Sequence, residues 1–342
     1  MYRKIKQLLA ASSNISLFLW AIFCLLIYLF MPDSPRIVPQ QLTTVELSAA
    51  YSENPQQLID LHDFDYVIKQ PPCKPHTRAL IMVHSAPLNI DKRSVIRRTW
   101  GSPSVISTSS PLRLFFLIGA VGDDAMQSML LAEHTRHGDL LQGNFLDGYF
   151  NLTYKHVMAL KWFHTRCEQA QLLVKVDDDI YLNTPQLLEH LRSPFPTDSI
   201  LEQTPSENLL LCAIRNRDRV IRSYSSKWRV SFWEYSGRYY PPFCPGFAVF
   251  YSSDVVRRLY LAAQRSSFFK LDDVFVTGLL SKRSNITITD LTPYVLSPEE
   301  LNFLLSRGTE SDQLKFLVSW HEMSAQQING LWQLYDIDNT SY

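Results

Sequence analysis

The chain has 342 residues, enough for one large or two medium domains with a sizeable core. Its 33 Lys and Arg residues balance 33 Asp and Glu residues, so the formal net charge is zero and nucleic acid is excluded as a bulk electrostatic partner. Aromatic residues make up 12% of the chain and 11 residues are Gly, a composition typical of globular proteins and not of disordered ones.

The N-terminus carries a hydrophobic segment that we interpret as a membrane anchor. Basic residues within the first six positions precede an uncharged apolar run at residues 17–31. With the milder stretch from residue 8, this run reaches the length of a membrane span at about 1.5 Å per residue. A cleaved signal peptide is the alternative, but no small-x-small site follows the run. The basic flank predicts a cytoplasmic tail at residues 1–14, an anchor at 15–31 and a lumenal remainder.

Two features of the remainder fit a lumenal location. N-glycosylation sequons begin at Asn151, Asn285 and Asn339. Beyond the anchor the chain has an even set of cysteines, Cys73, Cys167, Cys212 and Cys244. In an oxidising compartment such a set forms up to two disulfides, with buried free thiols as the alternative. The sequence does not choose the connectivity, and the spacing excludes a CxxC zinc site.

Residues 32–77 are rich in Pro and predict a stem, with one short helix near residues 53–61. From residue 78 onward, short apolar runs alternate with amphipathic segments. We predict strands at 79–83, 112–118, 172–176, 209–214 and 247–251, and helices at 91–99, 123–137, after Asn151, at 253–264 and at 273–280. This alternation predicts an α/β domain over residues 78–342 with a mostly parallel sheet, whose ligands bind beyond the carboxyl ends of the strands.

Three consecutive carboxylates at residues 177–179 follow the predicted strand at 172–176 and precede the apolar pair Ile180 and Tyr181. Like charges beside a core are costly unless a cation lies among them. An EF-hand loop is excluded because Tyr181 and Leu182 occupy the last two places of its pattern. A D-x-D turn instead places two carboxylates on one side of an extended chain, where they can hold Mg²⁺ or Mn²⁺ and leave room for phosphate oxygens.

Six blocks of sequence follow one another in a distinctive order. They are KRSVIRRTWG at 92–101, Glu133 with GDLLQGNFLDGYFNLTYK at 138–155, KVDDD at 175–179, KWRV at 227–230, YPPFCPG at 240–246 and DDVFVTG at 272–278. With these blocks the chain resembles the β1,3-galactosyltransferase and β1,3-N-acetylglucosaminyltransferase family, glycosyltransferase family 31, from about residue 78 to residue 332. The resemblance implies a GT-A fold, a UDP-sugar donor, Mn²⁺, and transfer with inversion to a hydroxyl of an acceptor glycan.

The resemblance also implies roles for single residues. Asp179 matches the main metal ligand, with Asp177 beside it and His321 as a further ligand, although a solvated role for His321 is the alternative. Asp273 matches the base that takes the proton of the acceptor hydroxyl, and the alternative is a first-turn carboxylate that stabilises the helix dipole. Transfer by a single displacement needs no covalent nucleophile, and no nucleophile motif such as G-x-S-x-G is present.

Further residues of the blocks are candidates for binding. On the nucleotide side these are Arg93, Arg97, Lys155, Lys175 and Asp178, and for the basic ones ion pairs within the fold are the alternative. In the acceptor and donor loops they are Trp228, Tyr240, Gly246 and Asp272. The surrounding aromatic residues at 228–243 suit stacking against sugars, with core packing as the alternative.

The chain departs from the family pattern at three positions. The family has Glu where Asp272 stands, Asp where Asn144 stands, and Ser or Ala where Pro245 stands, which leaves donor and acceptor preference open. We expect a type II enzyme of the Golgi membrane that uses UDP-galactose, with UDP-N-acetylglucosamine as the second donor, and a homodimer is compatible with it. An inactive lumenal chaperone or lectin-like binder on the same fold is the alternative from another class.

Overall fold

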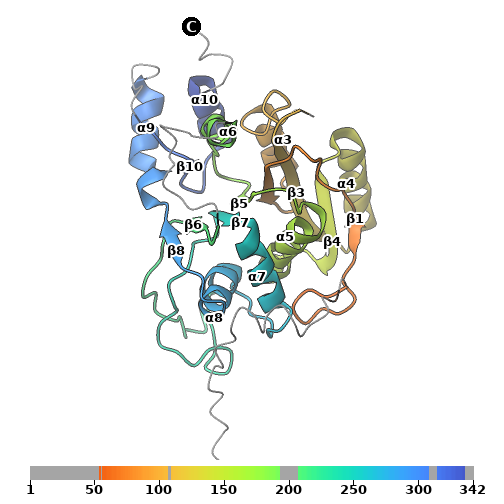
Figure 1. Cartoon of the computed structure of the whole chain (residues 1–342), viewed down its shortest axis with the longest axis vertical. Helices are drawn as coiled ribbons and strands as arrows, with labels where there is room; N and C mark the ends of the chain where they lie inside the picture. The colour runs from red at the N-terminus through yellow and green to blue at the C-terminus, as the bar shows by residue number, and fades with distance from the viewer. Residues whose placement is uncertain (1–53, 55, 107–108, 193–206, 308–313, 336–342) are drawn as a thin grey trace, which may run out of the picture. The chain divides into compact units, whose positions relative to one another are not determined.

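A sheet of eight strands runs through the centre of the folded unit, and helices cover both of its faces (Figure 1). This computed structural model describes residue 54 and residues 56–106, 109–192, 207–307 and 314–335. The strands are β1 (Tyr66–Ile68), β2 (Ala79–His84), β3 (Leu112–Ala120), β4 (Leu140–Leu146), β5 (Leu172–Asp177), β6 (Leu210–Cys212), β7 (Ala248–Ser252) and β8 (Ile288–Asp290), with β9 (Val295–Leu296) and β10 (Val318–Ser319) as a separate pair. The helices are α3 (Ile90–Arg98), α4 (Asp124–His137), α5 (Leu152–Arg166), α6 (Thr184–Arg192), α7 (Ser253–Ala263), α8 (Ser281–Arg283), α9 (Pro298–Arg307) and α10 (Ala325–Tyr335), together with the 3-10 helices η1 (Tyr149–Asn151) and η3 (Thr292–Tyr294) and the π-helix η2 (Val274–Leu280).

The predicted mostly parallel sheet is confirmed. Its centre consists of β4, β3, β2 and β5, which run parallel to one another. Helices α3, α4 and α5 connect these strands in sequence, because parallel neighbours need a crossover connection. Strands β6 and β8 keep the same direction, whereas β1 and β7 run against it. Since β5 and β7 are antiparallel, the chain enters β7 beside the carboxyl end of β5.

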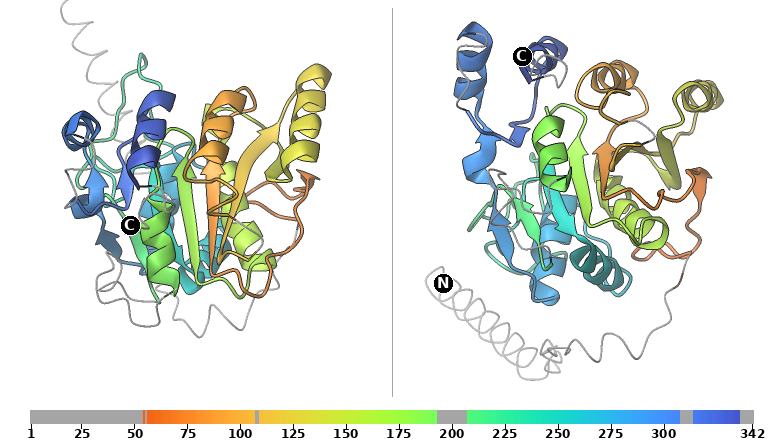
Figure 2. Two further views of the ribbon diagram at one scale, coloured as in Figure 1. Left: turned by 90° about the horizontal axis from the view of Figure 1, so that it is seen from above. Right: turned by 45° about the horizontal axis from the view of Figure 1, so that its top comes forward.

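The sheet divides the core into two layers, because successive residues of a strand point to opposite faces. In β2, Ala79, Ile81 and Val83 pack with the helices α3, α4, α6, α9 and α10. Leu80 and Met82 pack on the other face, with α5, α7 and η2. Figure 2 shows the sheet between these helical layers. Both faces are covered, so a ligand can reach the strands only at their ends.

Most predicted elements of the first half are confirmed to within two residues of their predicted bounds. Strand β3, however, continues through Gly119 to Ala120. A side chain on Gly119 would lie 2.8 Å from the main chain of Asp147, so this glycine lets the end of β4 approach closely. Strand β4 was not predicted, because its sequence LLQGNFL interrupts the apolar run with polar residues. The helix predicted at residues 273–280 is a π-helix, a form often found at functional sites.

The folded unit begins before the predicted boundary at residue 78. Strand β1 pairs with β4, so residues 66–68 belong to the central sheet although they precede this boundary. The short helix predicted near residues 53–61 is wrong for the described part, where Leu58 and Leu61 form a bridge within a tight turn. The predicted tail at 1–14, the anchor at 15–31, the first part of the stem and Asn339 lie outside the described residues. Within the described part, no helix is long and apolar enough to cross a membrane.

Two disulfides connect the cysteines that were singled out from the sequence. Cys73 is bonded to Cys167, with their Cα atoms 4.9 Å apart, and Cys212 to Cys244, with Cα atoms 5.7 Å apart. The first disulfide ties the segment before β2 to the end of α5. The second joins the end of β6 to the chain that returns to β7, and so closes the long segment between these strands.

Candidate active site

A cavity of about 530 Å³ lies at the carboxyl ends of β2 and β5. His84 ends β2 and Asp177 ends β5, and these two residues lie opposite each other in the sheet. The cavity is also lined by residues 245 and 246, just before β7, and by the carboxylates Asp272 and Asp273, just before η2. The predicted site residues Lys175, Asp177, Trp228, Tyr240, Gly246, Asp272 and Asp273 all line this one cavity. The topology thus brings together positions that are about a hundred residues apart.

Lys175 links two parts of the cavity lining, the end of β5 and the chain just before β7. Its Nζ donates to Asp177 Oδ1 at 2.8 Å and to the main-chain oxygen of Gly246. Burial disfavours the charged ammonium, but the carboxylates of Asp177 and Asp272 outweigh this effect and raise the pKa of Lys175. The side chain is therefore a buried, permanently charged cation at a strand end. A Cβ on Gly246 would lie 3.4 Å from this Nζ, in direct contact with the ammonium.

Asp273 is a carboxylate that readily holds a proton. It caps η2, and its Oδ1 accepts a hydrogen bond from the main-chain N–H of Val274 at 2.7 Å. Burial, followed by the negative charge of Asp272, raises the pKa of Asp273 to about 7. A side chain with a pKa near the working pH is suited to general base catalysis. The neighbouring Asp272 stays ionised, because the stabilisation by His156 and Lys175 outweighs burial and lowers its pKa.

Asp272 is held in place by a buried chain of hydrogen bonds. Nδ1 of His156 lies 3.1 Å from Asp272 Oδ2, and Nε2 of the same ring lies 2.8 Å from the hydroxyl of Tyr251. His156 belongs to α5 and Tyr251 to β7, so both partners come from rigid elements. The sequence did not single out either residue. His84 and Tyr149 also line the cavity, and each had a signal in the sequence, namely a position at a predicted strand end and a position within the block at 138–155.

The three carboxylates of the triplet have different surroundings. Asp178 is buried and fully engaged, because Ser85 Oγ and Asn89 Nδ2 both donate to it at 2.8 Å and Lys92 Nζ at 3.1 Å. Asp179 is partly exposed, with Lys92 Nζ at 3.3 Å. Asp178 therefore anchors the loop before α3, whereas Asp177 and Asp179 are only partly buried and are each paired with one lysine, Lys175 and Lys92. The structure does not bring Asp178 to the cavity.

The predicted metal ligand His321 lies in a segment that contacts the triplet. The main-chain N–H of Met323 donates to the carbonyl oxygen of Asp179 at 2.9 Å. The ring of His321 packs at 5.7 Å from that of Phe247, and its Nδ1 is 3.8 Å from Glu322. Among the described residues, no group of three or more His, Cys, Asp or Glu side chains is already assembled to hold a metal ion.

Three cations predicted on the nucleotide side are engaged elsewhere. Arg93 is fully buried and donates to Glu133 from Nε at 2.8 Å and from Nη2 at 2.6 Å. Arg97 pairs with Asp139 at 2.8 Å, and Lys155 with Asp147 at 2.8 Å. The structure does not place any of these three cations on the cavity at the strand ends.

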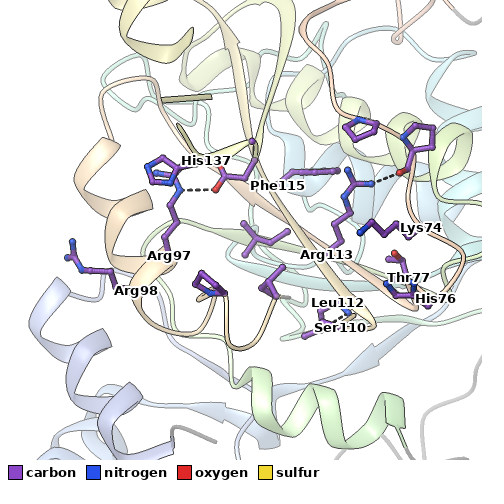
Figure 3. A pocket seen from close by; sticks show the side chains of 18 of the residues that line it. Lys74, His76, Thr77, Arg97, Arg98, Ser110, Leu112, Arg113, Phe115 and His137 are labelled. Atoms are coloured by element: carbon purple, nitrogen blue, oxygen red, sulfur yellow. Dashed lines mark hydrogen bonds and ion pairs between the residues drawn. The ribbon is translucent and has the colours of Figure 1, made fainter. Parts of the chain in front are cut away.

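Arg97 instead lines a second cavity, of about 700 Å³, at the amino end of β3 (Figure 3). The lining of this cavity includes Lys74, Arg98 and Arg113. Figure 3 shows Arg97 paired with a carboxylate that also lines the cavity. That carboxylate belongs to Asp139, the one Asp or Glu in the lining. A carboxylate held in an ion pair with Arg97 is not free to accept a proton from a substrate, so this larger cavity is not the candidate active site.

An aromatic wall faces the carboxylates of the active-site cavity. Trp228 Nε1 donates to the hydroxyl of Tyr149 at 2.7 Å, and Lys227 Nζ lies 4.6 Å and 5.0 Å from the centres of these two rings. The hydroxyl of the buried Tyr240 and Nε2 of His84 find no hydrogen-bond partner among the described residues. Buried polar groups without partners at a cavity indicate that a polar ligand belongs there.

The two remaining sequons differ in their surroundings. Asn151 is partly buried, and its Nδ2 donates to the carbonyl oxygen of Leu146 at 2.8 Å. Asn285 is exposed, at a turn with φ of 52°. Asn285 is therefore the more accessible of the two to a glycosylating enzyme.

Comparison with known proteins agrees with this site. Residues 91–292 match the family model described as Galactosyltransferase. A β1,3-galactosyltransferase 5 of Pan paniscus is 32% identical over 255 residues, which cover 74% of this chain and 79% of the relative. A lactosylceramide 1,3-N-acetyl-β-D-glucosaminyltransferase of Homo sapiens is 34% identical over 217 residues, 62% of this chain and 55% of the relative. An N-acetyllactosaminide β1,3-N-acetylglucosaminyltransferase 4 of Mus musculus is 30% identical over 225 residues, 66% of this chain and 61% of the relative. The matched residues include the triplet and Asp273, and the chain belongs to the galactosyltransferase family.

Proposed function

We propose that this hexosyltransferase is an inverting β1,3-galactosyltransferase with a GT-A fold, which moves galactose from UDP-galactose to an acceptor glycan on a protein or lipid. The observation that carries the proposal is the arrangement of Asp273, with its pKa near 7, beside the Lys175–Asp177 pair in one cavity. UDP-N-acetylglucosamine is the second donor, because the relatives include transferases named for either sugar.

The chemistry follows from the two walls of the cavity. On the acceptor side, Asp273 takes the proton of the attacking hydroxyl as its oxygen bonds to the anomeric carbon. On the donor side, the ammonium of Lys175 stabilises the negative charge that develops on the departing diphosphate. Because attack and departure occur on opposite faces of the sugar in a single step, the configuration inverts. The aromatic wall of Trp228 and Tyr149 orients the acceptor ring.

A divalent cation fits the two carboxylates of the triplet that are only partly buried. Asp177 and Asp179 offer the hard oxygen ligands that Mn²⁺ prefers, and His321 lies on the segment bonded to the main chain of Asp179. Such an ion keeps several positions for phosphate oxygens, which is consistent with the small number of protein ligands at this strand end. When bound, it would supply Lewis acid stabilisation of the leaving diphosphate.

A Golgi location with a type II anchor is part of the proposal. It is supported by the uncharged apolar run at residues 17–31, by the basic flank before it and by the two disulfides, which form in oxidising compartments. The catalytic domain would then face the lumen, where Asn285 is accessible for glycosylation.

The test is release of UDP by the full-length protein, purified in detergent and supplied with Mn²⁺, the two donors and a panel of acceptor glycans. Wild type should release UDP above the blank, and Asp179→Ala should lose this activity. Asp273→Asn should bind UDP normally but lose transfer. Asp124→Ala, an exposed carboxylate in the first turn of α4, is the matched control and should behave as wild type. Equal UDP release by wild type and both site variants would refute the enzyme and favour a binding protein.

A further inference from the structure

The long segment between β6 and β7, whose course Figure 1 shows, carries aromatic rings that are exposed to solvent. Trp233 is 99% exposed, Tyr224 87% and Phe232 69%. None of the three lines the active-site cavity. Leaving such rings in water forgoes roughly 25 cal/mol for each Å² of apolar surface that could be buried. Exposed apolar groups gathered on one segment mark a surface that contacts another body.

The segment is held in this conformation by hydrogen bonds from one side chain. The guanidinium of Arg222 donates to the carbonyl oxygens of Val230 at 2.8 Å, Tyr235 at 2.7 Å and Gly237 at 2.8 Å. Its Cζ also lies 4.1 Å from the centre of the Phe232 ring. The rings are therefore presented outward by a fixed turn and are available for contact without rearrangement.

The same segment is strongly basic although the whole chain is neutral. Between residues 215 and 239 the cations are Arg215, Arg217, Arg219, Arg222, Lys227, Arg229 and Arg238, and the anions are Asp218 and Glu234. Both anions are already paired, Asp218 with Arg215 at 2.7 Å and Glu234 with Lys270 at 3.3 Å. Among the cations, Arg229 lies 3.8 Å over the ring of Tyr224. The exposed rings thus lie among cations whose charge is not balanced within the segment.

This combination fits the interfacial zone of a phospholipid bilayer. Trp and Tyr rings settle at the level of the headgroups, where one end of the ring is apolar and the other is wet. Arg and Lys side chains are attracted to lipid phosphates, and basic segments with Trp and Phe on their apolar side bind in the plane of this zone. A purely glycan-binding surface would not need unpaired cations around the rings, because neutral sugars carry no charge.

The segment is continuous with the active site. Arg219, Ile221 and Trp228 line the cavity, and the main-chain N–H of Val230 donates to the carbonyl oxygen of Ile221 at 2.9 Å. Trp228 of the wall that orients the acceptor and the exposed rings are therefore parts of one folded segment. A bilayer that contacts the rings would hold its glycolipids next to the entrance of the cavity.

We propose that residues 215–239 form a lipid-facing surface, and that the enzyme uses it to take acceptor glycans anchored in a phospholipid bilayer. This inference rests on the proposed glycosyltransferase function and names the class of acceptor for the same site. The rings and cations contact the lipid, while the sugar end of the glycolipid extends to Trp228 and Asp273.

The test compares one acceptor glycan in two forms. The full-length protein is assayed with a glycan from the acceptor panel that supports UDP release, carried either on ceramide in phosphatidylcholine–detergent mixed micelles or on a methyl group in solution. The variant is Phe232→Ser/Trp233→Ser, which changes residues outside the cavity. The control is Phe303→Ser, an exposed aromatic side chain on α9. We expect the variant to lose about tenfold in kcat/KM on the ceramide form and less than about twofold on the methyl glycoside.

A second pair of variants tests the charge. Arg217→Glu and Arg238→Glu should weaken activity on the ceramide form more when the micelles contain phosphatidylserine than when they contain only phosphatidylcholine. If the Phe232→Ser/Trp233→Ser variant lost activity equally on both acceptor forms, the rings would act on the glycan or on the fold, and the proposal would be overturned. It would also be overturned if this variant lost no activity on either form, or if Phe303→Ser lost as much activity as this variant. If wild type acts on neither form, the proposed glycosyltransferase function itself fails, which is a different result from a variant that matches wild type.

Discussion

The raised pKa of Asp273 predicts how activity depends on pH. Burial and the charge of Asp272 raise this pKa to about 7, so the base is about 9% ionised at pH 6 and about 91% ionised at pH 8. The value of kcat/KM for the acceptor should therefore rise roughly tenfold between these two pH values. A carboxylate near its ordinary pKa of 3.8 would be ionised throughout this range and would give a flat profile.

The variant Asp272→Asn isolates one cause of the shift. It keeps the size of the side chain but removes the negative charge beside Asp273, so the pKa of Asp273 should fall and the midpoint of the profile should move to lower pH. The assay is kcat/KM for the acceptor from about pH 5 to about pH 9 with the donor at saturation. Asp218→Asn removes another carboxylate of the same cavity, one that is paired with Arg215, and should leave the midpoint unchanged. A flat wild-type profile, or equal shifts in the two variants, would refute the reasoning.

The same shift has a consequence for stability. The folded protein holds the Asp273 proton more tightly than the unfolded chain, whose carboxyl has a pKa near 3.8. The contribution of this group is therefore most favourable below pH 3.8 and is lost as the pH rises towards about 7. Asp273→Asn should accordingly have a higher Tm than wild type at pH 8, while the two should approach each other at acidic pH. A variant that melts lower at both pH values would contradict this.

Three further variants test separate parts of the site. Arg93→Met removes two hydrogen bonds to the buried Glu133 and leaves Arg97 as its remaining cationic partner, so we expect a loss of up to about 3–5 kcal/mol in unfolding free energy with little change in UDP affinity, measured by denaturant unfolding and by UDP titration. His156→Phe removes a hydrogen bond to the charged Asp272 and should lower kcat about tenfold with the donor KM unchanged, whereas His156→Asn should retain more activity. Trp228→Ala should raise the acceptor KM about threefold to tenfold, and Trp228→Phe less, in initial-rate assays.

Each of these expectations has an outcome that would contradict it. Arg98→Met removes an exposed guanidinium on the same helix as Arg93 and should not change stability; equal unfolding curves for the two variants would show that the buried pair is unimportant. A large rise in donor KM for His156→Phe would place this ring on the nucleotide and not behind Asp272. A rise in donor KM for Trp228→Ala would likewise move the aromatic wall to the donor side of the cavity.

Local patterns in the sequence were sufficient to predict the strand ends that form the site. The apolar run at residues 172–176 and the polar residues that follow it are signals that need no knowledge of distant partners. For Asp273 the local pattern predicted only the start of a helix, and its role as the base was implied by the resemblance to the glycosyltransferase family. Pattern and resemblance together predicted these residues as parts of one site, and the cavity contains Asp177 and Asp273 together.

The partners of charged side chains could not be predicted in the same way. Arg93 lies 40 positions from Glu133 in the sequence, and Arg97 lies 42 from Asp139, so neither pairing leaves a local signal. A basic residue near an expected diphosphate site is equally compatible with binding a substrate and with a buried ion pair. His156 escaped notice for a related reason, because its role depends on an acceptor 116 positions away.

The disulfide between Cys212 and Cys244 closes a covalent ring around the segment that carries Trp228 and the exposed rings. The ring begins at the end of β6 and returns just before Gly246, whose carbonyl oxygen accepts a hydrogen bond from Lys175. Most residues proposed to contact the acceptor therefore lie within one covalently closed segment, while Tyr149 and the residues proposed for donor binding and proton transfer lie outside it. Exchanging residues 213–243 between members of the galactosyltransferase family, with both cysteines retained, should therefore transplant a preference for the acceptor and leave the choice of nucleotide sugar with the host.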